Sequence, residues 1–163
     1  MSARRATPGL YVDTSCLLKL LWQEPESTRL AALIERESRV VVSELTILEA
    51  VVQIHGRRVA GLLRGPDAKR LESALDRLLE AEPFERIALE GDSFDRARSQ
   101  VRRLRKRGHC RTLDRLHLAL MEAEGLGRLL TNDDKQAVAA RAAGLKVALP
   151  RARKLRSPSM ATG

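Results

Sequence analysis

In the stretch GLYVDTS, residues 9–15, a short apolar run typical of a buried strand breaks off at a carboxylate. Four later runs have the same aliphatic and β-branched character: RVVV (39–42), FERIAL (84–89), RLLT (128–131) and KVAL (146–149). Helical patterns fill the gaps between these runs. Strands that alternate with helices predict an α/β fold, a three-layer α/β/α sandwich around a mostly parallel five-stranded sheet.

Caps and breakers bound the helical patterns. One helix is expected over Pro25–Ser38, since proline suits a first helical turn. A later helix is expected to begin after an N-cap at Asp92 and to end at Gly108, and the next to be capped by Thr112. The helix after Asp92 carries an apolar stripe formed by Phe94, Ala97, Val101 and Leu104.

Length and composition indicate one soluble domain. The chain has 163 residues, of which 44% are hydrophobic and 31% charged, as in compact globular proteins. We expect the folded domain to span 10–149. A disordered amino-terminal segment, 1–9, and a basic, flexible tail, 150–163, are expected to flank it because both lack apolar periodicity.

The charge balance favours a polyanionic partner, since 30 Lys and Arg stand against 21 Asp and Glu, a formal net charge of +9. The chain has no run of about 18 apolar residues and begins without a signal-peptide apolar stretch, so we expect a cytoplasmic protein with no membrane contact. The two cysteines, Cys16 and Cys110, lack the paired spacing of a zinc site and are expected to be free thiols.

Four acids fall where ligands bind in such a sheet, beyond the carboxyl ends of its strands. Asp13 ends the first strand and Asp133 follows the fourth, while Glu49 lies one turn into the helix after the second. Asp114 opens a helix with little polar face. Helix capping or the helix dipole explains each acid alone. Gathered in apolar surroundings, the four would have to take up protons or bind a cation.

Carboxylates without histidine or thiolate partners select a hard cation, so the sequence predicts Mg²⁺ at this site, with Mn²⁺ as the alternative. In a basic protein, such a site indicates hydrolysis of phosphodiester bonds by metal-activated water. One ion or two would both be consistent with four acids.

The same residues resemble the PIN-domain family and, within it, the VapC-like toxin ribonucleases. YVDTS looks like the family's strand followed by D-[TS]-[SN], and SELTILE like its S-x5-E segment. RTLDRLHLALMEA looks like its D-x2-H-[LI]-A helix, and LLTNDD contains its T-x-D segment. The resemblance implies catalytic and metal-binding roles for Asp13, Glu49, Asp114 and Asp133, with Thr131 as a hydrogen-bonding neighbour.

The resemblance covers residues 10–149 and implies a flavodoxin-like sheet, a magnesium-dependent endoribonuclease, a homodimer and a small antitoxin that blocks the acidic groove. Asp134 departs from the pattern and adds a fifth carboxylate where a basic residue is common. Similar domains without an antitoxin process RNA, so an RNA-processing nuclease is one alternative. A non-catalytic nucleic-acid-binding module is another.

Two other magnesium-binding classes fit less well. A response-regulator receiver needs an adjacent acid pair near the first strand and a lysine after the last, but Tyr11 and Val12 precede Asp13, and Pro150 follows the last strand. A haloacid-dehalogenase phosphatase needs a second Asp two residues after the first, where Ser15 stands.

Side chains around the acids leave two interpretations open. His117, one turn after the third acid, is either a hydrogen-bonded core histidine or a neighbour of the metal ligands. Thr14 and Ser15 either cap a helix or contact phosphate or water.

The stretch VRRLRKRGHCR, residues 101–111, has six basic residues and no acid, and we expect it to hold the RNA backbone. Only 2% of the residues are aromatic, so Tyr11 and Trp22 are the main candidates for stacking on bases.

Overall fold

The structure, a computed structural model, describes residues 9–22, 24–103 and 108–150. At its centre lies a five-stranded sheet of order β3-β2-β1-β4-β5 in which every neighbouring pair is parallel. The predicted α/β fold with five strands is confirmed, and the sheet is parallel throughout. Its strands are β1 (Leu10–Val12), β2 (Val40–Ser43), β3 (Phe84–Ile87), β4 (Arg128–Leu130) and β5 (Lys146–Ala148).

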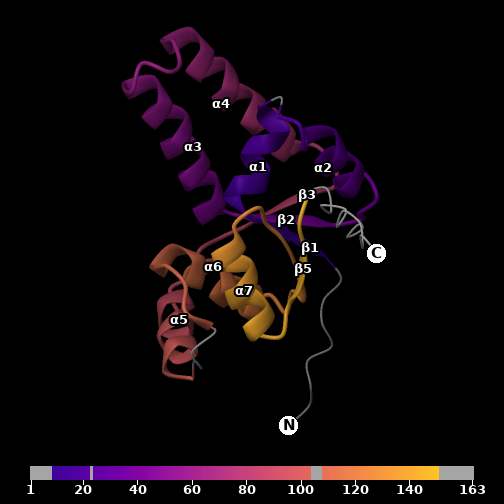
Figure 1. The fold of residues 1–163 in the computed structure, drawn as a ribbon, viewed down its shortest axis with the longest axis vertical. Coiled ribbons are helices and arrows are strands. Elements are labelled where there is room, and N and C mark those ends of the chain that lie inside the picture. The colour runs from indigo at the N-terminus through magenta and orange to yellow at the C-terminus, as the bar shows by residue number, and fades with distance from the viewer. Residues whose placement is uncertain (1–8, 23, 104–107, 151–163) are drawn as a thin grey trace, which may run out of the picture.

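The described residues form seven helices: α1 (Thr14–Leu21), α2 (Ser27–Ile34), α3 (Glu44–Val59), α4 (Gly65–Glu80), α5 (Ser93–Arg102), α6 (Thr112–Ala123) and α7 (Asp134–Ala142). Helices α1 to α4 lie on one side of the sheet and α5 to α7 on the other (Figure 1). Successive side chains of a strand point to opposite faces of the sheet and so pack against different helices. Leu10 and Val12 pack against α1 to α4, whereas Tyr11 packs with α6 and α7. The predicted three-layer sandwich is therefore present.

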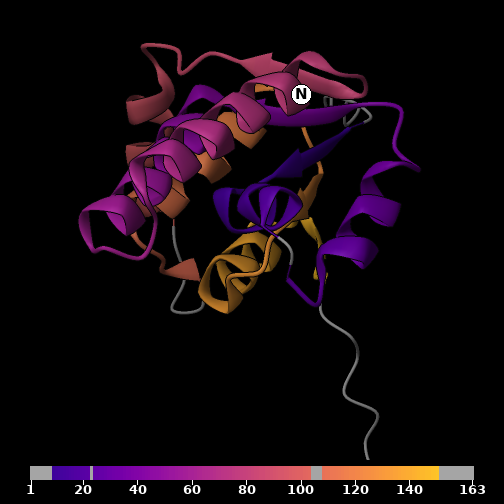
Figure 2. The ribbon, with the colours of Figure 1, turned by 90° about the horizontal axis from the view of Figure 1, so that it is seen from above.

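Helices α3 and α4 form a helical hairpin that extends away from the sheet (Figures 1 and 2). Leu75 and Leu79, from the leucine-rich side of α4, are buried in the hydrophobic core, where they join Ile54 of α3. The hairpin therefore belongs to the same folded unit as the sheet.

Three helix boundaries differ from the predictions. The helix expected over Pro25–Ser38 spans only Ser27–Ile34, because the N–H of Ser27 bonds the carbonyl of Glu24 and closes a turn before the helix begins. Helix α5 ends at Arg102 and does not reach Gly108. The expected side-chain cap of α5 is also absent, since Asp92 occupies the N-cap position but makes no side-chain capping bond.

The N-cap of α6 is Arg111, one residue before the predicted Thr112. The reason is that the Asp114 carboxylate, in the first turn of the helix, accepts the N–H of Arg111. Glycines follow two of the helices. Gly125 and Gly144 follow α6 and α7 with φ of 66° and 85°, a backbone conformation that favours glycine.

The apolar stripe of α5 is only partly buried. Ala97 packs into the core, but Phe94 and Val101 are 52% and 53% exposed, so these two members of the predicted stripe do not face the core. Both line a shallow hollow between α5 and α6. Leu104, the last member of the predicted stripe, lies outside the described residues.

The predictions of disorder for residues 1–8 and 151–163 also concern parts of the chain outside the described residues. Within the described ranges, none of the helices combines the length and the apolar character that crossing a bilayer requires.

Candidate functional site

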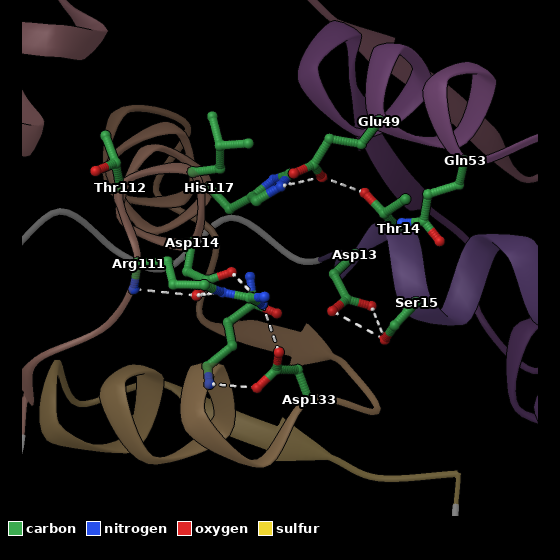
Figure 3. Close-up of a pocket in the computed structure, with 12 residues that line it drawn as sticks. Asp13, Thr14, Ser15, Glu49, Gln53, Arg111, Thr112, Asp114, His117 and Asp133 are labelled. Carbon is green, nitrogen blue, oxygen red and sulfur yellow. Dashed lines mark hydrogen bonds and ion pairs between the residues drawn. The ribbon is translucent and has the colours of Figure 1, made fainter. Parts of the chain in front are cut away.

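A cavity of about 390 Å³ lies beyond the carboxyl ends of β1, β2 and β4. It is lined by the four acids that the sequence analysis selected, and these come from four different segments of the chain (Figure 3). The parallel sheet explains their convergence, because the carboxyl ends of its strands meet at one edge. The four are Asp13, Glu49, Asp114 and Asp133. Their expected roles as ligands stay predictions.

Asp13 is buried at the start of α1, where only 4% of its surface is exposed. Its carboxylate caps the helix by accepting the N–H of Cys16 at 3.0 Å, and it accepts the hydroxyls of Ser15 at 2.8 Å and of Thr131. Burial raises the pKa of Asp13, although these three donors act in the opposite direction. A buried carboxylate that lines a cavity, as Asp13 does, is suited to binding a cation.

Thr131 reaches Asp13 because β1 and β4 are neighbours, with Val12 opposite Leu130, so that Asp13 and Thr131 follow directly after paired residues. The Thr131 hydroxyl donates to Asp13 and accepts the N–H of Asp133 at 3.0 Å. Thr131 is thus the hydrogen-bonding neighbour that the sequence predicted, and it links two of the four acids.

Glu49 projects from α3 toward the cavity (Figure 3) and is bonded by two side chains. The hydroxyl of Thr14 donates to it, and the Nε2 atom of His117 lies 2.9 Å from the same oxygen. Burial acts to raise the pKa of Glu49. The hydrogen bonds from His117 and Thr14 outweigh that effect, so the pKa lies below its ordinary value and Glu49 stays ionised.

His117 connects Glu49 to the core. Its Nδ1 atom lies 2.7 Å from the Tyr11 hydroxyl, whose pKa is raised by burial, so the phenol keeps its proton. In the neutral imidazole, Nδ1 accepts from Tyr11 and Nε2–H donates to the Glu49 carboxylate. His117 is therefore both a hydrogen-bonded core histidine and a neighbour of a candidate ligand. Tyr11 is fully buried, so the prediction that it stacks on bases is wrong.

Asp114 and Asp133 share one cation, the guanidinium of Arg111. Its Nε and Nη2 atoms lie 3.0 and 3.3 Å from the two carboxylate oxygens of Asp114, and Nη2 lies 2.6 Å from Asp133. Asp133 also caps α7 by accepting the N–H groups of Lys135 and Gln136. Capping thus accounts for the local contacts of Asp133 without a metal.

The remaining side chains at the site are organised around the acids. Ser15 donates to Asp13 and accepts the N–H of Asn132 at 2.9 Å. It therefore links the junction of β1 and α1 to the junction of β4 and α7. Thr14 and Ser15 therefore orient carboxylates. They do not cap α1, whose N-cap is Asp13, and their contact with phosphate or water stays a prediction. The amide of Gln136, which sequence reasoning missed, lies 2.9 Å from the Thr131 hydroxyl. Asp134 is exposed as the first residue of α7.

Arg111 was predicted only as one member of a basic stretch, and its contacts with the acids were missed. A usable signal was its position three residues before Asp114, because an acid in the first turn of a helix can accept the N–H of the N-cap residue. Of the same stretch, residues 104–107 lie outside the described residues. Arg102 and Arg103 are exposed at the end of α5.

The donor set fits a hard divalent cation in type and location, because carboxylate and hydroxyl oxygens converge on one cavity. The present arrangement is not a finished ligand shell. In the described part of the chain, no three His, Cys, Asp or Glu side chains are grouped so that they could hold a metal ion. Arg111 occupies the space between two of the acids, so a cation bound there requires Arg111 to move.

Comparison with protein families now gives the class of the chain. The model of the PIN domain matches residues 10–142, which is most of the sequence, and the chain belongs to the PIN domain family. A search of the curated proteins found no match.

Solved structures share this fold at low sequence identity. VapC20 of Mycobacterium tuberculosis, a toxin that cleaves the sarcin–ricin loop, superimposes with a TM-score of 0.63 and 17% identity, covering 80% of this chain and 94% of its own. VapBC2 of Rickettsia felis, bound to a promoter DNA fragment, superimposes with a TM-score of 0.64 and 17% identity, and the match covers 86% of this chain and 98% of the VapBC2 chain. FitAcB of Neisseria gonorrhoeae superimposes with a TM-score of 0.61 and 20% identity, and the match covers 86% of this chain and 97% of the FitAcB chain.

Proposed function

We propose that this protein is a divalent-metal-dependent endoribonuclease, acts in the cytoplasm, and is the toxin of a toxin–antitoxin pair. The observation that carries the proposal is the convergence of four acids from four segments on one cavity at the carboxyl edge of the sheet. Membership of the PIN domain family and the fold shared with VapC structures support the nuclease assignment.

The proposed cofactor is Mg²⁺, with Mn²⁺ as a substitute, which when bound would supply an activated water and offset negative charge at the phosphate. Asp13 and Asp114 are the central ligands in this proposal, since each is fixed at a helix start by backbone hydrogen bonds. Glu49 and Asp133 complete the ligand set or hold water. His117 orients Glu49 through its bond to the carboxylate.

RNA is the proposed substrate because a net charge of +9 favours a polyanion, and because VapC20, which shares the fold, cleaves an RNA loop. The contacts are expected to be mainly with phosphates, since aromatic residues are scarce and Tyr11 is buried. Trp22 is engaged by Arg57, whose guanidinium lies 3.9 Å above its ring.

An antitoxin partner is proposed on the basis of the structures with the same fold, several of which are toxin–antitoxin complexes. A homodimer is proposed with it. The test is to search beside the gene for a short open reading frame, to express the chain together with its product, and to measure the mass of the complex by light scattering. Co-purification with loss of nuclease activity supports the pair, whereas an active chain that binds nothing from that locus favours an RNA-processing nuclease.

One observation favours a non-catalytic nucleic-acid-binding module as the second candidate. Arg111 already pairs with both Asp114 and Asp133, so these acids have a structural use without a metal. Such a module would bind RNA but would not cut it.

Cleavage of a structured RNA by the purified protein separates these candidates. We expect cleavage with Mg²⁺, none with excess chelator, and a loss of at least about 100-fold in Asp13→Asn and Asp114→Asn, because removing a metal ligand removes the charge stabilisation at the phosphate. Asp76→Asn, at an exposed position on α4, is the matched control and should keep full activity. Cleavage that survives both active-site substitutions would point to a contaminating nuclease, and RNA binding without cleavage would leave the binding module.

A further inference from the structure

We propose that Arg111 is a built-in counter-cation of the acidic cavity, and that a divalent ion binds only by displacing its guanidinium. The inference rests on the proposed metal site and adds a regulatory element to it. Arg111 would set the metal affinity of the protein and keep the carboxylates together when the metal is absent.

The geometry of the cavity carries the argument. Arg111 is the sole Lys or Arg among the described residues that line it. Its side chain makes three close contacts with two carboxylates from different helices, at 3.0 and 3.3 Å to Asp114 and at 2.6 Å to Asp133 (Figure 3). The guanidinium thus lies where a cation would join α6 to α7.

The surroundings allow Arg111 to leave. Its side chain is 69% exposed, whereas that of Asp114 is only 9% exposed, so the guanidinium can return to water while the carboxylate stays in place. The cap of α6 does not depend on the guanidinium. The backbone N–H of Arg111 still donates to Asp114 at 3.2 Å and keeps this carboxylate oriented toward the cavity.

The positive charge of Arg111 is expected to affect both the stability of the metal-free protein and its affinity for a metal ion. With Arg111 removed, Asp114 and Asp133 lose their shared cation, and the cavity gains negative charge that only a bound cation offsets. Metal-free protein is therefore expected to lose stability in Arg111→Ala, while the free energy of metal binding becomes more favourable because no internal cation has to be expelled.

The test is calorimetric titration of the full chain with MnCl₂, together with thermal unfolding in chelator and in saturating Mn²⁺. The variants are Arg111→Ala and, as the matched control, Arg103→Ala. The control removes the same charge from an exposed arginine that pairs with Glu122, outside the cavity lining. Any effect of net charge alone is thus shared by both variants.

We expect Arg111→Ala to bind Mn²⁺ roughly tenfold more tightly than the wild type and Arg103→Ala to differ from it by less than about twofold. The melting temperature of Arg111→Ala should lie below that of the control in chelator, and the gap should close in saturating Mn²⁺. Equal Mn²⁺ affinities in the two variants, or weaker binding by Arg111→Ala, would overturn the inference while leaving the metal site intact. Failure of all three proteins to bind Mn²⁺ would instead refute the metal site itself, and the inference with it.

Discussion

Asp13 is the residue at which the proposed metal site bears most directly on the stability of the fold. It is almost fully buried, and burial raises the pKa of its carboxyl group. Three hydrogen-bond donors, the hydroxyls of Ser15 and Thr131 and the N–H of Cys16, favour the ionised carboxylate and so act against that effect. Such a group destabilises the folded state unless a cation is bound beside it.

We therefore expect Asp13→Asn to raise the melting temperature of the metal-free protein at pH 7.5, by about 2–4 °C for each kcal/mol gained. Asparagine is an equally good N-cap. The Thr131 hydroxyl can turn its proton to Gln136, 2.9 Å away, and accept from the new amide. Thermal unfolding in chelator measures the difference.

The sign of the pH dependence follows from the raised pKa. The folded state favours protonated Asp13, so its contribution to stability is full below the unfolded pKa and is lost as pH rises through the folded pKa. The advantage of Asp13→Asn should therefore shrink as the pH is lowered toward 4 and below. A variant that is less stable than the wild type at pH 7.5 would show that the charge of Asp13 is already compensated.

The acids were predictable at the residue scale because each follows a strand or opens a helix at the carboxyl edge of a parallel sheet. Their partners were only partly predictable. The Arg111 contacts depend on the path of the loop before α6 and on the conformation of a flexible side chain. The spacing of apolar residues, from which helices and strands are predicted, carries no information about either. Thr131 was foreseen from its motif, but Gln136 was not.

At the scale of elements, His117 joins three of them. It lies on α6, bonds Tyr11 of β1 on one side of its ring and Glu49 of α3 on the other. The chain of hydrogen bonds continues from Tyr11 to Ser43, the N-cap of α3, at 2.7 Å. The relative position of α3 and α6 is thus fixed by a buried polar network as well as by apolar packing.

We expect His117→Ala to destabilise the protein by about 1–3 kcal/mol, because the buried Tyr11 hydroxyl and the Glu49 carboxylate each lose a partner. His55→Ala is the control, since His55 pairs with Glu72 at a half-exposed position where such pairs contribute little. Urea unfolding of both variants measures the two losses. Equal losses would mean that the network does not stabilise the fold.

Element type and order were predictable from aliphatic runs and glycine stops, whereas several boundaries were not. The predicted start of α2 at Pro25 was wrong because a local turn satisfies the backbone before Ser27. The exposed Phe94 and Val101 of α5 had the spacing of a buried face, and only the arrangement of α5 against α6 reveals that they line a surface hollow.

At the scale of the whole molecule, the formal charge of +9 contrasts with an acidic cavity. Binding of RNA through phosphates releases counterions, so its affinity should fall steeply with salt. For roughly four phosphate contacts the logarithmic slope is about −3, which weakens binding about 50-fold between 50 and 200 mM salt. Fluorescence anisotropy of a labelled RNA, in chelator to prevent cleavage, measures the slope.

The exposed arginines at the end of α5 give a finer test of the same idea. If Arg102 contacts a phosphate, Arg102→Ala should reduce the magnitude of the slope by about 0.7. Arg29→Ala, an exposed arginine of α2, is the control that removes the same charge from the other face of the sheet. An affinity that barely changes with salt would argue against a polyanionic partner.

The central claim is that four separated segments place their carboxylates around a divalent-cation site. The most direct measurement is an anomalous difference map from crystals of the protein grown with Mn²⁺. The account predicts a strong peak in the cavity within coordination distance of Asp13 and Asp114, with Glu49 or Asp133 bound directly or through water and the Arg111 guanidinium turned away. A well-ordered cavity with Arg111 still bridging Asp114 and Asp133, and no peak beside Asp13 at saturating Mn²⁺, would contradict it.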